Sequence, residues 1–519
     1  MAHDALAPTV RVADSRTAAP PAPPEAVRPK SLPGPRRTDW KRTACILIGA
    51  ALFLAVYLAP SLGPAVDPQG ELFPLSREGK AALALFFLAA TWWVTEVVPI
   101  GVTSITIGVV QALFLIRPAR TAFTDFMDPS VWFIFGSLMF GMVFAKTGLT
   151  RRVAYKMLSL VGERTSLIYL GCFTMTAALT LVMAHTAVAA TVFPLFLAIY
   201  ALYSEDSGPT RFGKGLFMGM AFVAGAGSII TLLGAARGAV AIGFFRDITG
   251  RSVGFFELSY YMLPVGVVMT LLLWVFFLLY YPPERKTIPG LQERVARLYA
   301  SLGRITRGEV LALVIIVTTL LALSLRSFVP ALASLDKSAI ILVATVLFFL
   351  FKVVSLEDLE GTSWNIILLF GGAMSLGFCL WQTGAAAWLA VHWLGLFHDT
   401  QPFVFVMGIS AFVLVMTNLI MNVAAIAITM PVALVIAPYV GVAPEVVFFA
   451  CLVTAGMPFL LLVGAAPNAI AYTSNQFTVR EFFRAGIPAS LLLLAVLALF
   501  VLLIWPAMGM PVLQPTTGS

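Results

Sequence analysis

Arg237 is the side chain in this sequence with the clearest chemical implication. It lies in an apolar, glycine-rich stretch, and no acidic residue occurs within nine positions on either side. A charge at the depth of a lipid bilayer is costly unless it is paired or solvated. A fixed guanidinium there would attract an anion or stand where a metal ion would sit. The alternative is a position near the membrane interface, where the charge would reach water.

Polar side chains suited to a carboxylate occur in three further uncharged stretches. His185 and Thr186 lie in the first, Asn422 lies in the second, and Asn468 follows Pro467 in the third. Amides and hydroxyls hydrogen-bond carboxylate oxygens, and a histidine donates to a carboxylate or carries a transported proton. The alternatives are a neutral packing histidine and asparagines that cap helices. Together these stretches predict a substrate-binding site made by His185, Thr186, Arg237, Asn422, Pro467 and Asn468.

The composition places these stretches in a membrane. The chain has 519 residues, of which 60% are hydrophobic and 11% are charged, and its mean hydropathy is +0.94. Several uncharged runs exceed the ~20 residues that cross ~30 Å of hydrocarbon. A soluble domain is about a quarter charged, and a membrane β-barrel has short alternating segments. We therefore expect an all-α polytopic membrane protein in contact with the lipid bilayer.

The hydrophobic runs predict about eleven transmembrane helices and two re-entrant hairpins. The hairpins, 165–204 and 400–444, each carry a central proline, Pro194 and Pro431, after small or polar residues. Folded at that centre, each half is short for a full crossing; two ordinary helices are the alternative. The eleven helices are expected at about 44–61, 81–97, 99–116, 131–147, 215–246, 258–281, 308–326, 338–354, 364–381, 445–474 and 485–506.

The distribution of basic residues indicates the orientation. Counted from a cytoplasmic start, the inside segments hold 22 of the 33 Lys and Arg residues. Cytoplasmic loops are enriched in these residues, so we expect a cytoplasmic N-terminus, an outside C-terminus and a place in the inner (cytoplasmic) membrane. The Pro- and Ala-rich start predicts a disordered cytoplasmic tail, 1–43. Because the net charge of +8 lies mainly in loops, no nucleic-acid partner is expected.

The two halves of the chain echo each other at an offset of 235 to 237 residues. Thr147-Gly148 is echoed by Thr383-Gly384, Ala184-His185-Thr186-Ala187 by Met421-Asn422-Val423-Ala424, and Pro194 by Pro431. In the predicted topology the hairpins enter from opposite sides, which makes an inverted repeat typical of secondary transporters. The predicted segments are a first helix with its outside loop (44–80), the first repeat (81–281), a cytoplasmic linker (282–307), the second repeat (308–506) and a tail (507–519).

A family signature appears near the start of the first repeat. The run Trp92-Trp93-Val94-Thr95-Glu96-Val97-Val98-Pro99, followed by Val102-Thr103, resembles the WWxTE(A)xP signature of the divalent anion:sodium symporter family. The hairpins and residues 463–470 are similar to that family's two Ser-Asn-Thr tips and its Thr-Pro-Pro-Asn loops. The resemblance covers residues 80–506. It implies a homodimer with a scaffold domain and a mobile transport domain, which carries di- and tricarboxylates or sulfate by an elevator movement.

The sequence departs from the family pattern where the resemblance implies sodium ligands. The degenerate positions are Ala184, His185, Arg237, Met421, Asn422 and Val423. Ala184 and Met421 offer no oxygen ligand from their side chains. The guanidinium of Arg237 would repel a cation or permanently replace its charge. We therefore predict a sodium-independent carrier that works by exchange or by proton coupling through His185.

The residues that the resemblance implies for substrate binding also depart from the family pattern. Arg237, His185 and Thr186 suit a carboxylate or a sulfonate, whereas the other end of the site is more apolar. A C4-dicarboxylate is the first prediction. The alternatives are a monoanion, such as a sulfonate or a monocarboxylate, and a sodium-coupled dicarboxylate or sulfate symporter.

Other classes of protein fit the sequence less well. An intramembrane enzyme would need a nucleophile–base pair or a metal cluster, but HExxH and GxSxG motifs are missing, as is a complete ATP-binding loop. The four cysteines form no CxxC pair, so neither a disulfide framework nor a zinc site is indicated. We expect a transporter without enzymatic activity, cofactor or bound metal. A channel or a non-transporting sensor of the same fold remains the alternative, which solute uptake would distinguish.

Overall fold

The computed structural model describes residues 40–513, except for 61, 67–71, 96, 205–207, 327, 363, 398–400 and 420. Most of the tail predicted at 1–43, and residues 514–519 of the tail predicted at 507–519, lie outside the described residues. The described part consists of helices, loops and one short antiparallel strand pair, β1 (Ala65–Val66) and β2 (Leu72–Phe73).

The helices of the first half and the linker cover most of the residues up to 301. They are α1 (Trp40–Leu58), α2 (Arg77–Thr95), α3 (Ile100–Leu113), α4 (Ala119–Thr124), the 3-10 turn η1 (Asp125–Met127), α5 (Pro129–Lys146), α6 (Leu149–Val161), α7 (Thr165–Leu179), α8 (His185–Tyr203), α9 (Arg211–Ser228), α10 (Arg237–Thr249), α11 (Phe255–Tyr280) and α12 (Leu291–Ser301).

The second half continues with helices of similar length and order. They are α13 (Arg307–Leu325), α14 (Pro330–Ala333), α15 (Lys337–Leu350), α16 (Leu356–Glu360), α17 (Trp364–Gln382), α18 (Ala385–Phe397), α19 (Pro402–Leu419), α20 (Asn422–Ile436), η2 (Ala437–Val440), α21 (Pro444–Ala455), η3 (Leu462–Gly464), α22 (Ala466–Tyr472), α23 (Val479–Leu499), the π-helical turn η4 (Phe500–Ile504) and α24 (Trp505–Ala507).

The polytopic helical class is confirmed, but the number of crossings is not. Nine helices in the described part are long and apolar enough to cross a membrane. Three of them, α8, α19 and α20, belong to the predicted hairpins, while α3 and α15 are apolar but shorter. The count of eleven crossings therefore stays a prediction.

Two predicted spans are interrupted at their glycine-rich or proline-containing segments. The span at 215–246 is α9 and α10, separated by residues 229–236, and the span at 445–474 is α21 and α22, separated by residues 456–465. We call these segments the first break and the second break. Each break leaves backbone groups without the partners that a continuous helix would give them.

Short elements between the predicted spans were not resolved from the sequence. α6 and α18 have 13 residues each, and both begin directly after a glycine with a left-handed backbone, Gly148 (φ 86°) and Gly384 (φ 75°). The threonine before each glycine donates to a carbonyl one turn back, Thr147 to Val143 and Thr383 to Cys379, both at 2.7 Å. The Thr-Gly echo in the sequence thus marks the same helix end in both halves.

Helix starts follow the local sequence. Asp128 and Asp336 accept hydrogen bonds from the N–H groups of Ser130 and Ser338, each at 2.7 Å, at the starts of α5 and α15. Side chains of this type satisfy N–H groups that have no partner within the helix. The starts of these two helices, which pack against each other, are therefore fixed by the same chemistry.

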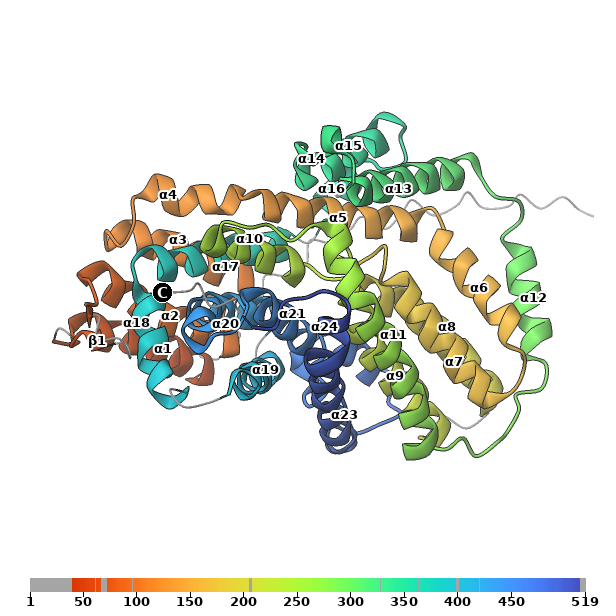
Figure 1. Ribbon diagram of the computed structural model, residues 1–519. Coiled ribbons are helices and arrows are strands. Elements are labelled where there is room, and N and C mark those ends of the chain that lie inside the picture. The colour runs from red at the N-terminus through yellow and green to blue at the C-terminus, as the bar shows by residue number, and fades with distance from the viewer. Residues whose placement is uncertain are drawn as a thin grey trace, which may run out of the picture.

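The helices pack in two groups that meet mainly through α10, α17 and α20, with further contacts of α8 with α5 and of α11 with α13. The first group contains α1–α5 and α13–α18, and the second contains α7–α11 and α19–α23 (Figure 1). Contacts of α10 with α5 and α17, and of α20 with α17 and α18, join the groups. Within the second group α22 packs against α8 and α9, and α10 packs against α20. Each half's broken helix therefore contacts the other half's hairpin.

Gly486 on α23 allows close packing against the second break. A Cβ atom at Gly486 would lie 2.0 Å from the carbonyl oxygen of Phe459. Because this neighbour is backbone and cannot rotate away, we expect Gly486→Ala to destabilise the protein by at least the ~1–3 kcal/mol typical of overpacking. The measurement is the thermal unfolding midpoint of the purified protein in detergent. Gly308→Ala, at an open position of α13, is the control, and equal midpoints for the two variants would contradict the packing.

Candidate functional site

The tips of the two helix pairs have the same backbone geometry. Ala184 precedes α8 with φ −59° and ψ 137°, and Met421 precedes α20 with φ −59° and ψ 142°. Neither residue offers a side chain that caps its helix. Helix N-termini without caps present free N–H groups and the positive end of the helix dipole. Both tips therefore favour a negatively charged group.

The first tip is tied to the first break. The backbone N–H of His185 donates to the carbonyl oxygen of Gly234 at 2.9 Å, and the ring nitrogen Nδ1 of His185 lies 3.2 Å from the same oxygen. The hydroxyl of Thr231 donates to the carbonyl of Leu181 at 2.9 Å. His185 is therefore part of the contact between hairpin and broken helix, and its side chain is half-buried.

The second tip is tied to the second break by different residues. The side-chain oxygen of Asn418 accepts from the N–H groups of Leu460 at 2.7 Å and Leu461 at 3.2 Å. The hydroxyl of Thr417 donates to the carbonyl of Ala455, the last residue of α21, at 3.0 Å. Asn418 thus holds the end of α19 against the second break.

A glycine in each break lies against its hairpin in the same way. A Cβ at Gly234 would lie 2.7 Å from the carbonyl oxygen of Thr180, and one at Gly464 would lie 2.9 Å from that of Thr417. The two threonines are 237 positions apart, the offset already seen in the tips. Thr180 and Thr417 were missed as site residues, although this offset was the signal that would have found them.

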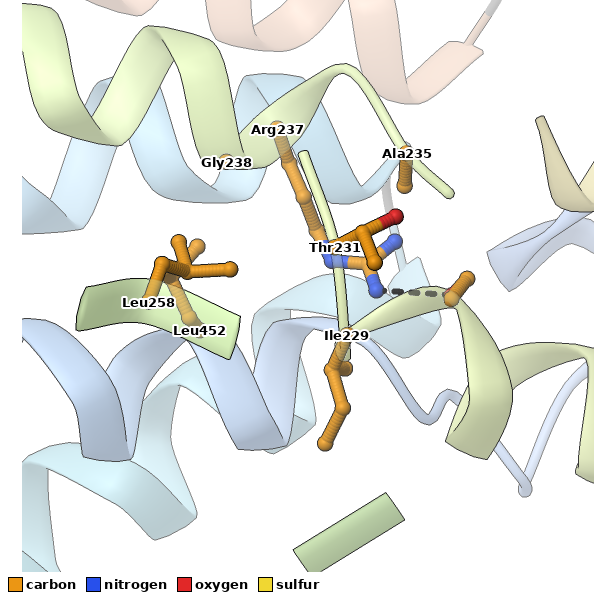
Figure 2. A pocket seen from close by; sticks show the side chains of 8 residues that line it. Ile229, Thr231, Ala235, Arg237, Gly238, Leu258 and Leu452 are labelled. Atoms are coloured by element: carbon orange, nitrogen blue, oxygen red, sulfur yellow. Dashed lines mark hydrogen bonds between the residues drawn. The ribbon is translucent and has the colours of Figure 1, made fainter. Parts of the chain in front are cut away.

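Arg237 is buried at the start of α10, with 2% of its surface exposed. Its Nη2 donates to the hydroxyl of Ser228, the last residue of α9, at 2.9 Å (Figure 2). The same nitrogen lies 2.7 Å from the position that a Cβ on Gly456 would take, directly after the end of α21. The guanidinium therefore lies where two helices end, and their negative dipole ends favour a cation there. Arg237 is therefore buried within the protein, and its depth in the membrane stays a prediction.

The space beside Arg237 is small. A cavity lined by Ser228, Ile229, Thr231, Ala235, Arg237, Gly238, Leu258 and Leu452 has a volume of about 10 Å³, which is room for about one water molecule. Figure 2 shows Leu258 and Leu452 facing the Arg237 side chain across it. Nη1 of Arg237 has no hydrogen-bond partner among the described residues. No organic acid fits in this cavity in the conformation shown.

The second break is bridged by a neutral side chain instead. The amide nitrogen of Asn468 donates to the carbonyl oxygens of Pro458 at 2.8 Å and Leu461 at 3.1 Å. Pro467 is buried at the start of α22. Asn468 therefore bridges the carbonyl groups that the break leaves free. Contact of Pro467 or Asn468 with a substrate stays a prediction.

The remaining predicted residues lie at the tips themselves. Asn422 is 7% exposed, and its Nδ2 has no hydrogen-bond partner among the described residues. Val423 beside it is buried, and Thr186 is half-buried. An amide donor without a partner is costly when buried, so Asn422 has hydrogen-bonding capacity that a bound group would satisfy.

The contacts bring two of the six predicted residues, His185 and Arg237, into one chain of neighbours. His185 contacts the first break at Gly234, Arg237 in that broken helix contacts the second break at Gly456, and Asn418 joins the second break to the second tip. No hydrogen bond joins Thr186 or Asn422 directly to Arg237 within the described residues. The site is therefore a line from tip to tip, with Arg237 near its centre.

Comparison with known proteins identifies the family. The sequence profile described as the sodium:sulfate symporter transmembrane region matches residues 49–511. The chain belongs to this family. The match confirms the resemblance to the divalent anion:sodium symporters that the Trp-Trp signature and the hairpin tips indicated.

Individual relatives agree with this assignment, and two solved structures have a similar fold. The chain is similar to the sodium-dependent dicarboxylate transporter SdcS of Staphylococcus saprophyticus, with 24% identity over 85% of this chain and 89% of the relative. The SdcS protein of Staphylococcus aureus also has 24% identity, over 91% and 92%. The fold of this chain is similar to that of the YdaH transporter of Alcanivorax borkumensis (TM-score 0.55, 16% identity, 91% of this chain and 100% of the other). The efflux pump MtrF of Neisseria gonorrhoeae has a TM-score of 0.54, with 13% identity over 89% and 93%.

Asn418 should stabilise the contact between the second tip and the second break. Asn418→Ala leaves the N–H groups of Leu460 and Leu461 without their acceptor, which typically costs about 1–3 kcal/mol for a buried group. We expect a lower thermal midpoint and faster proteolysis near residue 460. Ser410→Ala on the same helix removes a hydroxyl that bonds only its own helix, to Val406, and should change the midpoint little. The role of Asn418 would be rejected if both variants unfolded alike.

Proposed function

We propose that this chain is a secondary transporter of small organic anions, of the di- and tricarboxylate class, across the cytoplasmic membrane. We further propose that transport does not require sodium and is driven by exchange or by protons. Membership of the symporter family and the similarity to dicarboxylate transporters support the transport of such anions. The buried guanidinium of Arg237 between two helix ends supports the independence from sodium.

Several groups in the site favour an anion. The helices α8 and α20 begin without side-chain caps, and Asn422 has an unused amide donor. Helix N-termini of this kind bind carboxylates through backbone N–H groups. His185, Thr186 and Asn422 are the residues that we propose contact the substrate. Arg237 contributes its charge from a distance, because the cavity beside it has room for about one water molecule.

Hydrogen-bond donors of the chain itself already bridge the two breaks. A sodium ion binds to hard oxygen ligands, which free carbonyl groups at a helix break would supply. Here the guanidinium of Arg237 lies at the first break, and the amide of Asn468 donates to two carbonyl groups of the second. A cation at either place would compete with these donors, and at the first break it would also meet a like charge.

The proposed architecture follows the family. The helix pairs α7–α8 and α19–α20 would be re-entrant hairpins of an inverted repeat. We propose that the second helix group moves as the transport domain against a scaffold formed by the first group, in a homodimer. The meeting of these groups through α10, α17 and α20 supports this division.

Two classes of substrate fit the proposed site. A C4-dicarboxylate would use both tips, whereas the apolar side chains of Met421 and Val423 at the second tip favour a monoanion with an apolar end, such as a sulfonate or a monocarboxylate. Uptake of malate, succinate and methanesulfonate by the purified protein in liposomes would decide between them. Each anion is tested with sodium or choline outside, in empty vesicles and in vesicles preloaded with the same anion. Uptake that requires sodium would refute the proposal.

Removal of the Arg237 charge should abolish transport. In Arg237→Ala, the ends of α9 and α21 lose their cation, so we expect uptake to fall at least tenfold while the protein still purifies as a folded species. Arg480→Ala, which removes an exposed basic residue of α23, is the matched control and should transport normally. Normal uptake by Arg237→Ala would show that its charge is dispensable.

A combined substitution tests whether Arg237 replaces sodium. Ala184→Ser with His185→Asn restores oxygen ligands at the first tip, but a cation would still meet the guanidinium. We therefore expect sodium-stimulated uptake only when Arg237→Ala is added. Stimulation by sodium in the double variant, with Arg237 present, would contradict the replacement.

A further inference from the structure

His185 makes two contacts with a single carbonyl group. Its backbone N–H donates to the oxygen of Gly234 at 2.9 Å, and its ring nitrogen Nδ1 lies 3.2 Å from the same oxygen. A carbonyl oxygen only accepts hydrogen bonds. Nδ1 must therefore carry the hydrogen, and the contact fixes the tautomer of the ring.

The fixed tautomer determines whether the second ring nitrogen, Nε2, is a hydrogen-bond donor or an acceptor. In a neutral imidazole with hydrogen on Nδ1, Nε2 is an acceptor with a lone pair. Nε2 makes no hydrogen bond to a described residue, and the side chain is half-buried at the tip. A carboxylate is also only an acceptor. The neutral ring and an ionised anion therefore repel each other unless a proton is placed between them.

We propose that His185 binds a proton on Nε2 together with each anion, so that the chain is a proton–anion symporter. This inference rests on the proposed function and selects proton coupling over exchange. The proton binds from the outside solution with the substrate, lies between Nε2 and an oxygen of the anion, and leaves with it on the inside. Nδ1 keeps its hydrogen and its contact with Gly234 throughout.

The surroundings of His185 make the proton and the anion depend on each other. Arg237 follows Gly234, the residue that His185 contacts, by three positions, and its positive charge acts on the ring. His185 is also the first residue of α8, where a positive charge opposes the helix dipole. An imidazolium without an anion would therefore face both Arg237 and the helix end in a site of low dielectric. Protonation is favourable only when an anion supplies the opposite charge, which is a coupling free energy in the thermodynamic sense.

The elements packed against α8 carry other ionisable groups but no carboxylate. The elements are α5, α6, α7, α9 and α22. Lys146 pairs with Asp358 and Arg152 with Glu309, the hydroxyl of Tyr169 donates to Phe212, and Lys214 pairs with Glu481. The remaining groups are Arg151, Tyr155, Lys156, Cys172, Arg211 and Tyr472, with Tyr200 and Tyr203 at the far end of α8 itself. None of these elements brings an acidic side chain to the tip in the described part of the chain.

The tautomer is testable without any substrate. Nitrogen-15 NMR of the full chain, labelled at histidine, distinguishes a ring nitrogen with hydrogen from one without. The His185→Asn variant assigns the signal of His185, because the chain has four histidines. We expect hydrogen on Nδ1 and none on Nε2 near neutral pH. Hydrogen on Nε2 with none on Nδ1 would overturn the proposal, whatever the transport assays show.

Proton movement is tested in liposomes with fumarate, which is doubly ionised near neutral pH and has no hydroxyl group that donates to Nε2. The membrane potential is held at zero with potassium and valinomycin, and a dye inside reports pH. With the outside more acidic by one unit, one proton per anion gives up to about tenfold accumulation, and fumarate entry acidifies the interior. Fumarate accumulation that does not depend on the pH gradient would overturn the proposal. So would uptake of malate but not of fumarate, with no proton movement during malate uptake.

Two substitutions of His185 test the roles of its two ring nitrogens separately. In His185→Asn the amide nitrogen takes the place of Nδ1, which keeps the contact with Gly234 but removes Nε2; we expect uptake to fall at least tenfold. In His185→Gln the amide takes the place of Nε2 as a permanent donor, so we expect residual uptake that no longer moves protons or responds to pH. Proton-coupled uptake by His185→Gln would overturn the assignment.

His392 supplies a matched control. Its Nδ1 also lies near a backbone carbonyl, that of Trp388 at 3.1 Å, but the residue is exposed on α18. His392→Asn and His392→Gln should leave proton-coupled uptake unchanged. If the wild-type protein takes up none of fumarate, malate, succinate or methanesulfonate, the proposed function fails. Uptake without proton movement leaves that function intact and refutes only the symport.

Discussion

The centre of this protein depends on a cation placed where two helices end inside an apolar core. α9 and α21 stop at Ser228 and Ala455, and the guanidinium of Arg237 contacts the first end and lies against the glycine that follows the second. The last carbonyl groups of a helix have no partners within it, and the dipoles of both helices point their negative ends at this place. Without a positive charge there, the free carbonyl groups at the ends of α9 and α21 would lie close together in an apolar interior that solvates neither set. His185 contacts Gly234, three residues before Arg237, so the first hairpin is tied to the same break.

The two halves stabilise similar helix breaks with different side chains. Both hairpins approach their own break closely, through the contacts of Gly234 with Thr180 and Gly464 with Thr417. In the first half the break is stabilised by a charge, and in the second by the neutral amide of Asn468. The backbone geometry at the tips is repeated in the two halves, whereas the side chains at the two breaks differ.

Much of the architecture followed from the sequence because it depends on local patterns. Hydrophobic runs indicated most of the long helices, and the Thr-Gly echo marked corresponding positions in the two halves. The constant offset between the two halves also paired the tips of the two hairpins. The helices α6, α12 and α18 were missed because they are short and lie between the runs. The structural partners of the site were harder to predict, since Ser228, Gly456 and Pro458 come into contact only through the packing of distant segments. The burial of Arg237 was expected from its neighbours, but its place between two helix ends required the tertiary structure.

A fixed charge also changes how a carrier responds to voltage. A transporter whose cation dissociates returns across the membrane without that charge, so the potential acts on part of its cycle only. Arg237 cannot dissociate from the chain, and in a domain that carries it through the membrane field its charge is present in both directions. A full elementary charge is worth about 2.3 kcal/mol per 100 mV, and the movement of Arg237 through a fraction of the field would contribute that fraction. The resting potential would therefore favour one orientation of the empty carrier, and a bound anion would offset the bias.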